Sequence, residues 1–182
     1  SIKRLRDASY EFDNCEYFMT VARIQKDNNI ELILNSFINL PKEKIVIIGN
    51  WSKDNYGVNL KKKYSHYNNM YLLDAIYDLV ELNYLRSRCK LYIHGHSAGG
   101  TNPALVEAMN LGLPILAFNS GFNEHTTHGR AKYFKSSNEL QRLINNMDKH
   151  QIIELGNQMK KIALEHYTWF KISEQYEKII NI

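Results

Sequence analysis

The sequence predicts an α/β fold in which a parallel sheet carries helices on both faces. Short apolar runs of about five residues recur along the chain, and longer stretches with apolar side chains at helical spacing separate them. Strands that alternate with such helices form βαβ units, which build a parallel, Rossmann-like sheet. The 182 residues are enough for one such domain with its own core.

Six segments fit buried strands, because they are rich in β-branched and aromatic residues. They cover residues 17–22, 44–49, 70–73, 90–94, 114–118 and 131–134. The helices expected between and after them cover residues 30–37, 56–67, 79–85, 105–111, 139–147, 152–166 and 169–180. Asp74 or Asp78 is expected to cap the third helix. The polar segment 119–130 reads as a loop.

Composition excludes several classes of protein. Hydrophobic residues at 44% and charged residues at 23% are ordinary globular values, which exclude a disordered tail, a collagen-like repeat and a disulfide scaffold. The net charge of +4 is too small to argue for a nucleic-acid partner. The longest apolar runs, 45–49 and 111–118, fall far short of the ~20 residues that span a bilayer. Residues 1–7 lack the apolar core of a signal peptide.

Cys15 and Cys89 stand far apart in the chain and lack metal-ligand spacing. We expect both to be reduced, incidental thiols of a cytosolic protein.

The turn after the fourth strand carries the pattern of a phosphate site. Gly99 and Gly100 let the backbone approach a ligand closely. Pro103 suits the first position of a helix that Thr101 or Asn102 caps, so free N–H groups and a partial positive charge point into the turn. A plain strand–turn–helix fits the pattern equally well, because glycine-rich turns of this kind are common.

Two charged residues could complete this site. Glu107 lies one helical turn beyond Pro103 on the same face, where its carboxylate could accept hydrogen bonds from a ribose. Arg23 follows the first strand, and its guanidinium could clamp a diphosphate. Taken singly, Glu107 also fits a solvated side chain and Arg23 a surface residue paired with an Asp.

Four histidines lie in two neighbouring loops. His94 and His96 end the fourth strand, and His125 and His128 lie in the segment after the fifth. Neutral imidazoles that bind the backbone, a phosphate or a sugar hydroxyl explain them better than a metal, because no carboxylate or thiolate completes a standard ligand set. We therefore expect no metal and no cofactor.

The order of motifs resembles the C-terminal, donor-binding domain of group 1 (family 4) glycosyltransferases. Residues 19–30, MTVARIQKDNNI, resemble that family's G-R-L-x-x-x-K-G opening, and residues 102–115, NPALVEAMNLGLPI, resemble its L-E-A-M-A-x-G-x-P-V signature. Residues 119–124 stand where the family has G-G-x-x-E, and residues 167–177 resemble its last helix. Residues 27–31 and 94–103 are similar to a bacterial rhamnosyltransferase-like subset that builds cell-surface polysaccharide.

The resemblance implies one half of a GT-B enzyme. Residues 17–182 would bind a nucleoside diphosphate sugar, residues 1–16 would be a remnant of the interdomain linker, and the N-terminal, acceptor-binding half would be missing. The last helix carries an apolar stripe that includes Trp169 and Tyr176. The pattern alone predicts core packing for this stripe, whereas the resemblance implies that part of it docks on the missing half.

The resemblance also assigns roles to residues. Arg23, with Lys26 or Asn28, would neutralise the diphosphate leaving group, and Glu107 would accept the ribose hydroxyls. The base would rest near residues 73–77, against Leu73 and Ala75. The remaining donor contacts are expected from Asn28, His96, Gly99, Gly100, Thr101, Asn102 and Glu124.

Two positions depart from the family pattern. The family pairs two glutamates with seven residues between them, and here Glu107 matches the second while Gly99 stands in place of the first, which contacts the donor sugar. The usual lysine falls on Asn28, with Lys26 close by.

The resemblance therefore implies a metal-independent glycosyltransferase at the cytoplasmic face of the membrane. It would transfer a sugar, rhamnose in the narrower match, to a growing, lipid-linked cell-surface glycan, and this half alone would be inactive. A non-catalytic nucleotide-binding or regulatory module is the alternative. A flavodoxin-like or response-regulator domain ranks last, because residues 22–25 offer neither an acidic cluster nor a flavin-phosphate loop.

Overall fold

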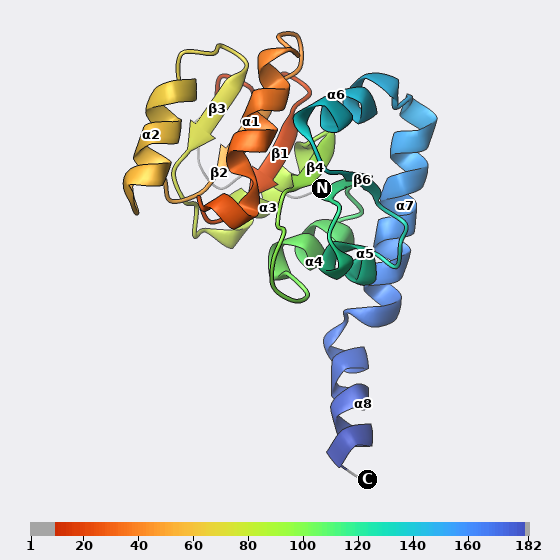
Figure 1. The fold of residues 1–182 in the computed structure, drawn as a ribbon. Helices are drawn as coiled ribbons and strands as arrows, with labels where there is room; N and C mark the ends of the chain where they lie inside the picture. The colour runs from red at the N-terminus through yellow and green to blue at the C-terminus, as the bar shows by residue number, and fades with distance from the viewer. Residues whose placement is uncertain (1–9, 181–182) are drawn as a thin grey trace.

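A computed structural model describes residues 10–180 and shows a six-stranded parallel sheet (Figure 1). The strand order is β3-β2-β1-β4-β5-β6, so the chain builds outward from β1 in one direction and then from β4 in the other. This confirms the predicted Rossmann-like fold. The strands are β1 (Phe18–Val21), β2 (Ile45–Ile48), β3 (Met70–Leu73), β4 (Leu91–His94), β5 (Ile115–Phe118) and β6 (Lys132–Phe134).

The helices follow the strands closely in sequence. They are η1 (Lys26–Asn28), α1 (Ile30–Ile38), α2 (Asn55–Tyr64), α3 (Leu79–Arg88), α4 (Pro103–Asn110), α5 (Gly121–Thr126), α6 (Ser137–Asn146), α7 (Lys149–His166) and α8 (Trp169–Ile180). In the part of the chain that is described, no helix is long and apolar enough to cross a membrane.

Alternation along each strand divides the core into two layers, because successive side chains of a strand point to opposite faces. On β2, Val46 and Ile48 join the cluster under α3, α4 and α7, while Ile45 and Ile47 join the cluster under α1, α2 and α6. The four central strands, β1, β2, β4 and β5, are almost entirely buried on both faces, which is why they read as continuous apolar runs rather than alternating ones.

Side-chain caps fix where the helices begin. Asp78, rather than Asp74, caps α3 by accepting hydrogen bonds from the N–H groups of Val80 and Glu81. Asn102, rather than Thr101, caps α4 and accepts from the N–H of Ala104. Both caps hold the loops in front of them at the carboxyl edge of the sheet.

The prediction that residues 119–130 form a loop is wrong for the part that forms α5. Ser120 caps this short helix, and Asn123 within it donates to the carbonyl oxygens of His96 and Phe118. Polar contacts rather than an apolar face hold α5 in place, so apolar periodicity gave no sign of it. The helix braces the loop that follows β4.

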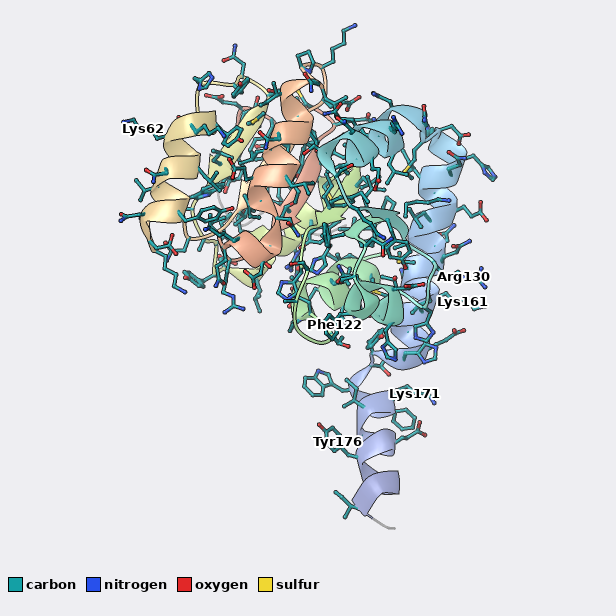
Figure 2. The ribbon with its side chains drawn as sticks, in the orientation of Figure 1. Lys62, Phe122, Arg130, Lys161, Lys171 and Tyr176 are labelled. Carbon is teal, nitrogen blue, oxygen red and sulfur yellow. The ribbon has the colours of Figure 1, made fainter. Side chains whose placement is uncertain are left out.

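The two ends of the described chain differ in how they pack against the core. Residues 1–9 of the expected linker lie outside the described residues, whereas Phe12 is buried in the core against Tyr17. At the other end, α8 projects away from the sheet, with the Tyr176 side chain clear of the core (Figure 2). Trp169 is 86% exposed, so the core packing that the pattern alone predicts for the stripe is wrong at these two positions.

Candidate functional site

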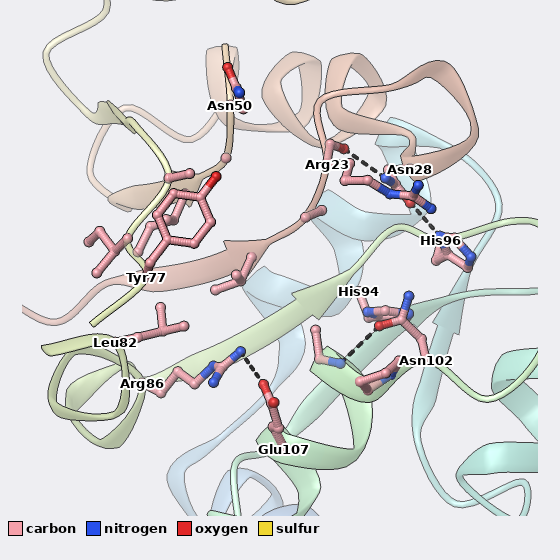
Figure 3. Close-up of a pocket in the computed structure, with 18 residues that line it drawn as sticks. Arg23, Asn28, Asn50, Tyr77, Leu82, Arg86, His94, His96, Asn102 and Glu107 are labelled. Carbon is pink, nitrogen blue, oxygen red and sulfur yellow. Dashed lines mark hydrogen bonds and ion pairs between the residues drawn. The ribbon is translucent and has the colours of Figure 1, made fainter. Parts of the chain in front are cut away.

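A pocket of about 430 Å³ lies at the carboxyl ends of the strands (Figure 3). Its walls come from residues 21–23 after β1, residues 48–50 after β2, residues 75–77 after β3, and His94 and His96 after β4. The N-terminal end of α4 and residues of α3 that face the sheet complete the walls of the pocket. The pocket therefore sits where the strand order reverses, between β1 and β4, which is where open α/β sheets bind ligands.

The pocket has an apolar side and a polar side. Figure 3 shows Tyr77 and Leu82 on one side and Arg23, His96 and Asn102 on the other. A flat ring system fits the first side, and an anion fits the second. This division suits a ligand with one aromatic and one charged end.

Arg23 supplies a free cation to the polar side. Its side chain is exposed and lines the pocket, and within residues 10–180 it makes no ion pair. The pairing with a neighbouring Asp that would explain a plain surface residue is therefore absent from the described structure. An unpaired guanidinium at a concave site is suited to bind a phosphate group.

The start of α4 faces the same side of the pocket. Asn102, Pro103 and Ala104 all line it. The N–H of Ala104 already donates to Asn102, and those of Leu105 and Val106 donate to the Asn102 carbonyl, so the helix offers mainly its dipole. Gly99, Gly100 and Thr101 are exposed and lie outside the pocket walls, so the structure does not bring their backbone to the cavity.

An ion pair that sequence reasoning missed lies across the floor of the pocket. Arg86 Nη2 lies 2.6 Å from Glu107 Oε2, and both side chains line the cavity. The Arg86 side chain is 2% exposed and that of Glu107 50%. The Arg86 Nε atom is buried without a hydrogen-bond partner. Because only one carboxylate oxygen of Glu107 faces Arg86, the other can accept from a ligand.

Two histidines close the polar side. His94 is 4% exposed, and its Nε2 atom is buried without a partner. Burial, and secondly the neighbouring His96, lowers the pKa of His94 to about 3, so this imidazole is neutral at physiological pH. His96 is hydrogen-bonded through Nδ1 to Oδ1 of Asn28. Asn28 in turn donates from Nδ2 to the Arg23 carbonyl at 2.7 Å.

Of the residues predicted for the donor site, the pocket brings together Arg23, Asn28, Ala75, His96, Asn102 and Glu107. Lys26 lies instead in a separate surface depression beside α1, and Glu124 in another beside α5 with His125 and His128. Leu73 precedes the pocket wall, and its carbonyl accepts from Trp51 Nε1. Among residues 10–180, no group of three or more His, Cys, Asp or Glu side chains could hold a metal ion.

Comparison with protein families places this architecture in a known class. The model of glycosyl transferases group 1 matches residues 1–166, and the chain therefore belongs to this family. Comparison with curated proteins finds no match.

Solved structures with the same fold come from glycosyltransferases. Anabaena HepE, in complex with UDP, is 18% identical, with a TM-score of 0.78 over 91% of this chain and 49% of its own. Sucrose-phosphate synthase from Thermosynechococcus elongatus is 16% identical, with a TM-score of 0.78 over 91% of this chain and 45% of its own. TarM is 16% identical, with a TM-score of 0.75 over all of this chain and 38% of its own. The chain thus spans half or less of the length of these structures.

Proposed function

We propose that this chain is the donor-binding half of a glycosyltransferase and holds a nucleoside diphosphate sugar in the pocket between β1 and β4. The observation that carries the proposal is the convergence of Arg23, the start of α4 and Glu107 on one cavity. HepE, which shares the fold, has been solved with UDP and with UDP-glucose.

The two sides of the pocket bind different parts of the nucleotide. The base rests on the apolar side, against Ala75 and Tyr77, and the ribose hydroxyls donate to the free oxygen of Glu107. The diphosphate meets the Arg23 guanidinium and the positive end of the α4 dipole. During transfer, negative charge grows on the departing diphosphate, and a cation already in place lowers the energy of that transition state.

Finer features of the activity belong to the same proposal. The donor sugar is rhamnose and the acceptor a growing, lipid-linked cell-surface glycan, in line with the similarity of residues 27–31 and 94–103 to rhamnosyltransferases. The enzyme works at the cytoplasmic face of the membrane without a metal, and an N-terminal half supplies the acceptor site. On this proposal the chain alone binds nucleotide and transfers no sugar, because the acceptor site belongs to the N-terminal half.

A second candidate is a non-catalytic nucleotide-binding or regulatory module. The observation in its favour is Gly99, which stands where the resemblance places a carboxylate that contacts the sugar. The backbone at Gly99 has φ +105°, a conformation that a glutamate would rarely adopt. Sugar transfer by the complete, two-domain protein would reject this candidate.

A thermal-shift panel tests the donor-binding proposal. The chain is heated with dTDP, UDP, GDP or FMN, and the panel is repeated with Glu107→Ala. A nucleoside diphosphate at 100 times its Kd should stabilise the chain by about 2.7 kcal/mol. We expect stabilisation by one nucleoside diphosphate, its loss in the variant, and no effect of FMN. Failure of every nucleoside diphosphate to stabilise the wild-type chain would contradict the proposal.

A further inference from the structure

The backbone on both sides of His96 is held in place by hydrogen bonds from other parts of the chain. Asn123 Nδ2 donates to its backbone carbonyl at 2.7 Å. On either side of it, the carbonyl of Gly95 accepts from Asn29 Nδ2, and the N–H of Ser97 donates to the Asp27 carbonyl. The loop after β4 is thus fastened to η1 and to α5 before any ligand arrives.

The hydrogen-bond chain from Arg23 to His96 determines which ring nitrogen carries the proton (Figure 3). The Arg23 carbonyl can only accept, so Asn28 donates to it from Nδ2 and turns Oδ1 towards His96. Oδ1 can also only accept, so Nδ1 of His96 must be the donor. In the neutral imidazole, Nε2 then carries a lone pair and is a hydrogen-bond acceptor.

That acceptor lies beside the space left by Gly99. A Cβ built at residue 99 would lie 3.1 Å from His96 Nε2, and Gly99 has φ +105°. Within residues 10–180, Nε2 of His96 makes no hydrogen bond, although the side chain lines the pocket. Gly99 is exposed and lies outside the pocket walls, so its missing side chain leaves the solvent-facing space beside this unused acceptor open to a ligand group.

From this geometry we infer that His96 Nε2 accepts a hydrogen bond from a hydroxyl of the donor sugar and so supplies the sugar contact of this site. The inference rests on the proposed function. Because the base occupies the side lined by Tyr77 and Leu82, and Arg23 holds the diphosphate, the sugar beyond the diphosphate is directed to the end where His96 and Asn102 lie. A carboxylate at residue 99 is not needed there, since the imidazole offers the same accepting function.

Calorimetry with matched nucleotides isolates the sugar contact. The pairs are UDP and UDP-glucose, GDP and GDP-mannose, and dTDP and dTDP-rhamnose, each titrated into the wild-type chain and into His96→Phe. The phenyl ring keeps the shape of the side chain and removes Nε2. We expect His96→Phe to weaken the sugar nucleotide by about threefold to tenfold, the range for one lost hydrogen bond, and to leave the nucleoside diphosphate unchanged. His150→Phe, on an exposed position of α7, is the matched control.

The outcomes separate the inference from the proposed function. Equal weakening of both members of a pair would overturn the inference and make His96 a phosphate or structural residue. Unchanged binding of both members would overturn it as well. If no nucleotide bound even the wild-type chain, the proposed function itself would fail.

His96→Phe also removes the hydrogen-bond partner of buried Asn28, which can destabilise the fold. A second measurement therefore uses the wild-type chain without any substitution. Long-range ¹H–¹⁵N correlation spectra of the labelled wild-type chain report the tautomer of each histidine. We expect the Nδ1–H form for His96, and an Nε2 shift that moves with the sugar nucleotide but not with its nucleoside diphosphate. An Nε2–H tautomer in the free protein, or equal shifts with both ligands, would overturn the inference.

Discussion

The ion pair between Arg86 and Glu107 combines a buried charge with a half-exposed one, at 2.6 Å. A buried guanidinium loses its hydration. The Glu107 carboxylate and a long hydrogen bond from Nη1 to Asn83 Oδ1, at 3.4 Å, replace only part of it, because Nε has no partner. The pair is thus better suited to orient the Glu107 carboxylate than to stabilise the fold. Sequence reasoning found Glu107 from its helical spacing but missed Arg86, because a basic residue in the last turn of a helix normally reads as solvated.

Arg86→Met tests this orienting role. The substitution keeps most of the buried volume and removes the guanidinium, and the half-exposed Glu107 carboxylate left behind stays hydrated. We therefore expect a loss in the free energy of unfolding smaller than the roughly 3–5 kcal/mol that follows when a fully buried charge loses its partner. The freed carboxylate should rotate, and the Kd of the preferred nucleoside diphosphate should rise about tenfold in calorimetry, the equivalent of about 1.4 kcal/mol. Arg88→Met, at an exposed position on the same helix, is the control and should leave the Kd unchanged. Equal Kd values for Arg86→Met and wild type would contradict the role.

His94 should make stability depend on pH. Its folded-state pKa of about 3 lies below the unfolded value of 6.5, so the unfolded chain binds the extra proton as the pH falls. The stability due to the neutral side chain is complete above pH 6.5 and is lost progressively as the pH falls towards 3. At pH 5 the loss should be about 2 kcal/mol.

Urea unfolding at pH 7 and pH 5 measures this loss, with His94→Leu as the comparison. The variant lacks the titrating group, so its stability should fall by about 2 kcal/mol less over that interval than the wild type's. All other titrating groups are common to the two proteins. Parallel losses would show that His94 does not titrate as its burial predicts.

At the scale of elements, the strands and long helices followed from apolar periodicity, and their observed bounds differ from the predicted ones by a few residues. β2 is the simplest case, because four consecutive buried residues, Ile45–Ile48, are all apolar and β-branched. Apolar periodicity did not predict α5, because Asn123 holds this helix by side-chain hydrogen bonds to the carbonyl oxygens of His96 and Phe118. Hydrogen bonds between loops that are distant in the sequence produce no periodic pattern of apolar residues.

The close packing of α7 on the turn after α4 gives a prediction at this scale. A Cβ at Gly156 would lie 2.4 Å from the Gly112 carbonyl oxygen. Alanine normally stabilises a helix interior by about 1 kcal/mol relative to glycine, but here it would force α7 away from the turn. We expect Gly156→Ala to destabilise the chain by about 1–3 kcal/mol in urea unfolding. Asn157→Ala, at the next and exposed position of α7, should be neutral or stabilising, and a stabilised Gly156→Ala would refute the contact.

At the scale of the whole molecule, the strand order explains where the site lies. The chain leaves β1 towards β2 and later returns to β4 on the other side of β1, so the loops after β1 and β4 diverge and leave a crevice between them. The sequence predicted that the ligand site lies at the carboxyl edge and supplied six residues of the pocket wall. Lys26 and Glu124, which the sequence also predicts for the site, line other depressions, because a sequence shows which loop a residue belongs to and not which side of the loop it faces.

The central claim is that this crevice holds a nucleoside diphosphate, and a crystal structure of the chain with the nucleotide selected by the thermal-shift panel tests it most directly. We predict density for the diphosphate between Arg23 and the start of α4, ribose hydroxyls within hydrogen-bond distance of Glu107, and the base beside Tyr77. A nucleotide bound elsewhere on the chain, with the pocket between β1 and β4 empty, would contradict the claim.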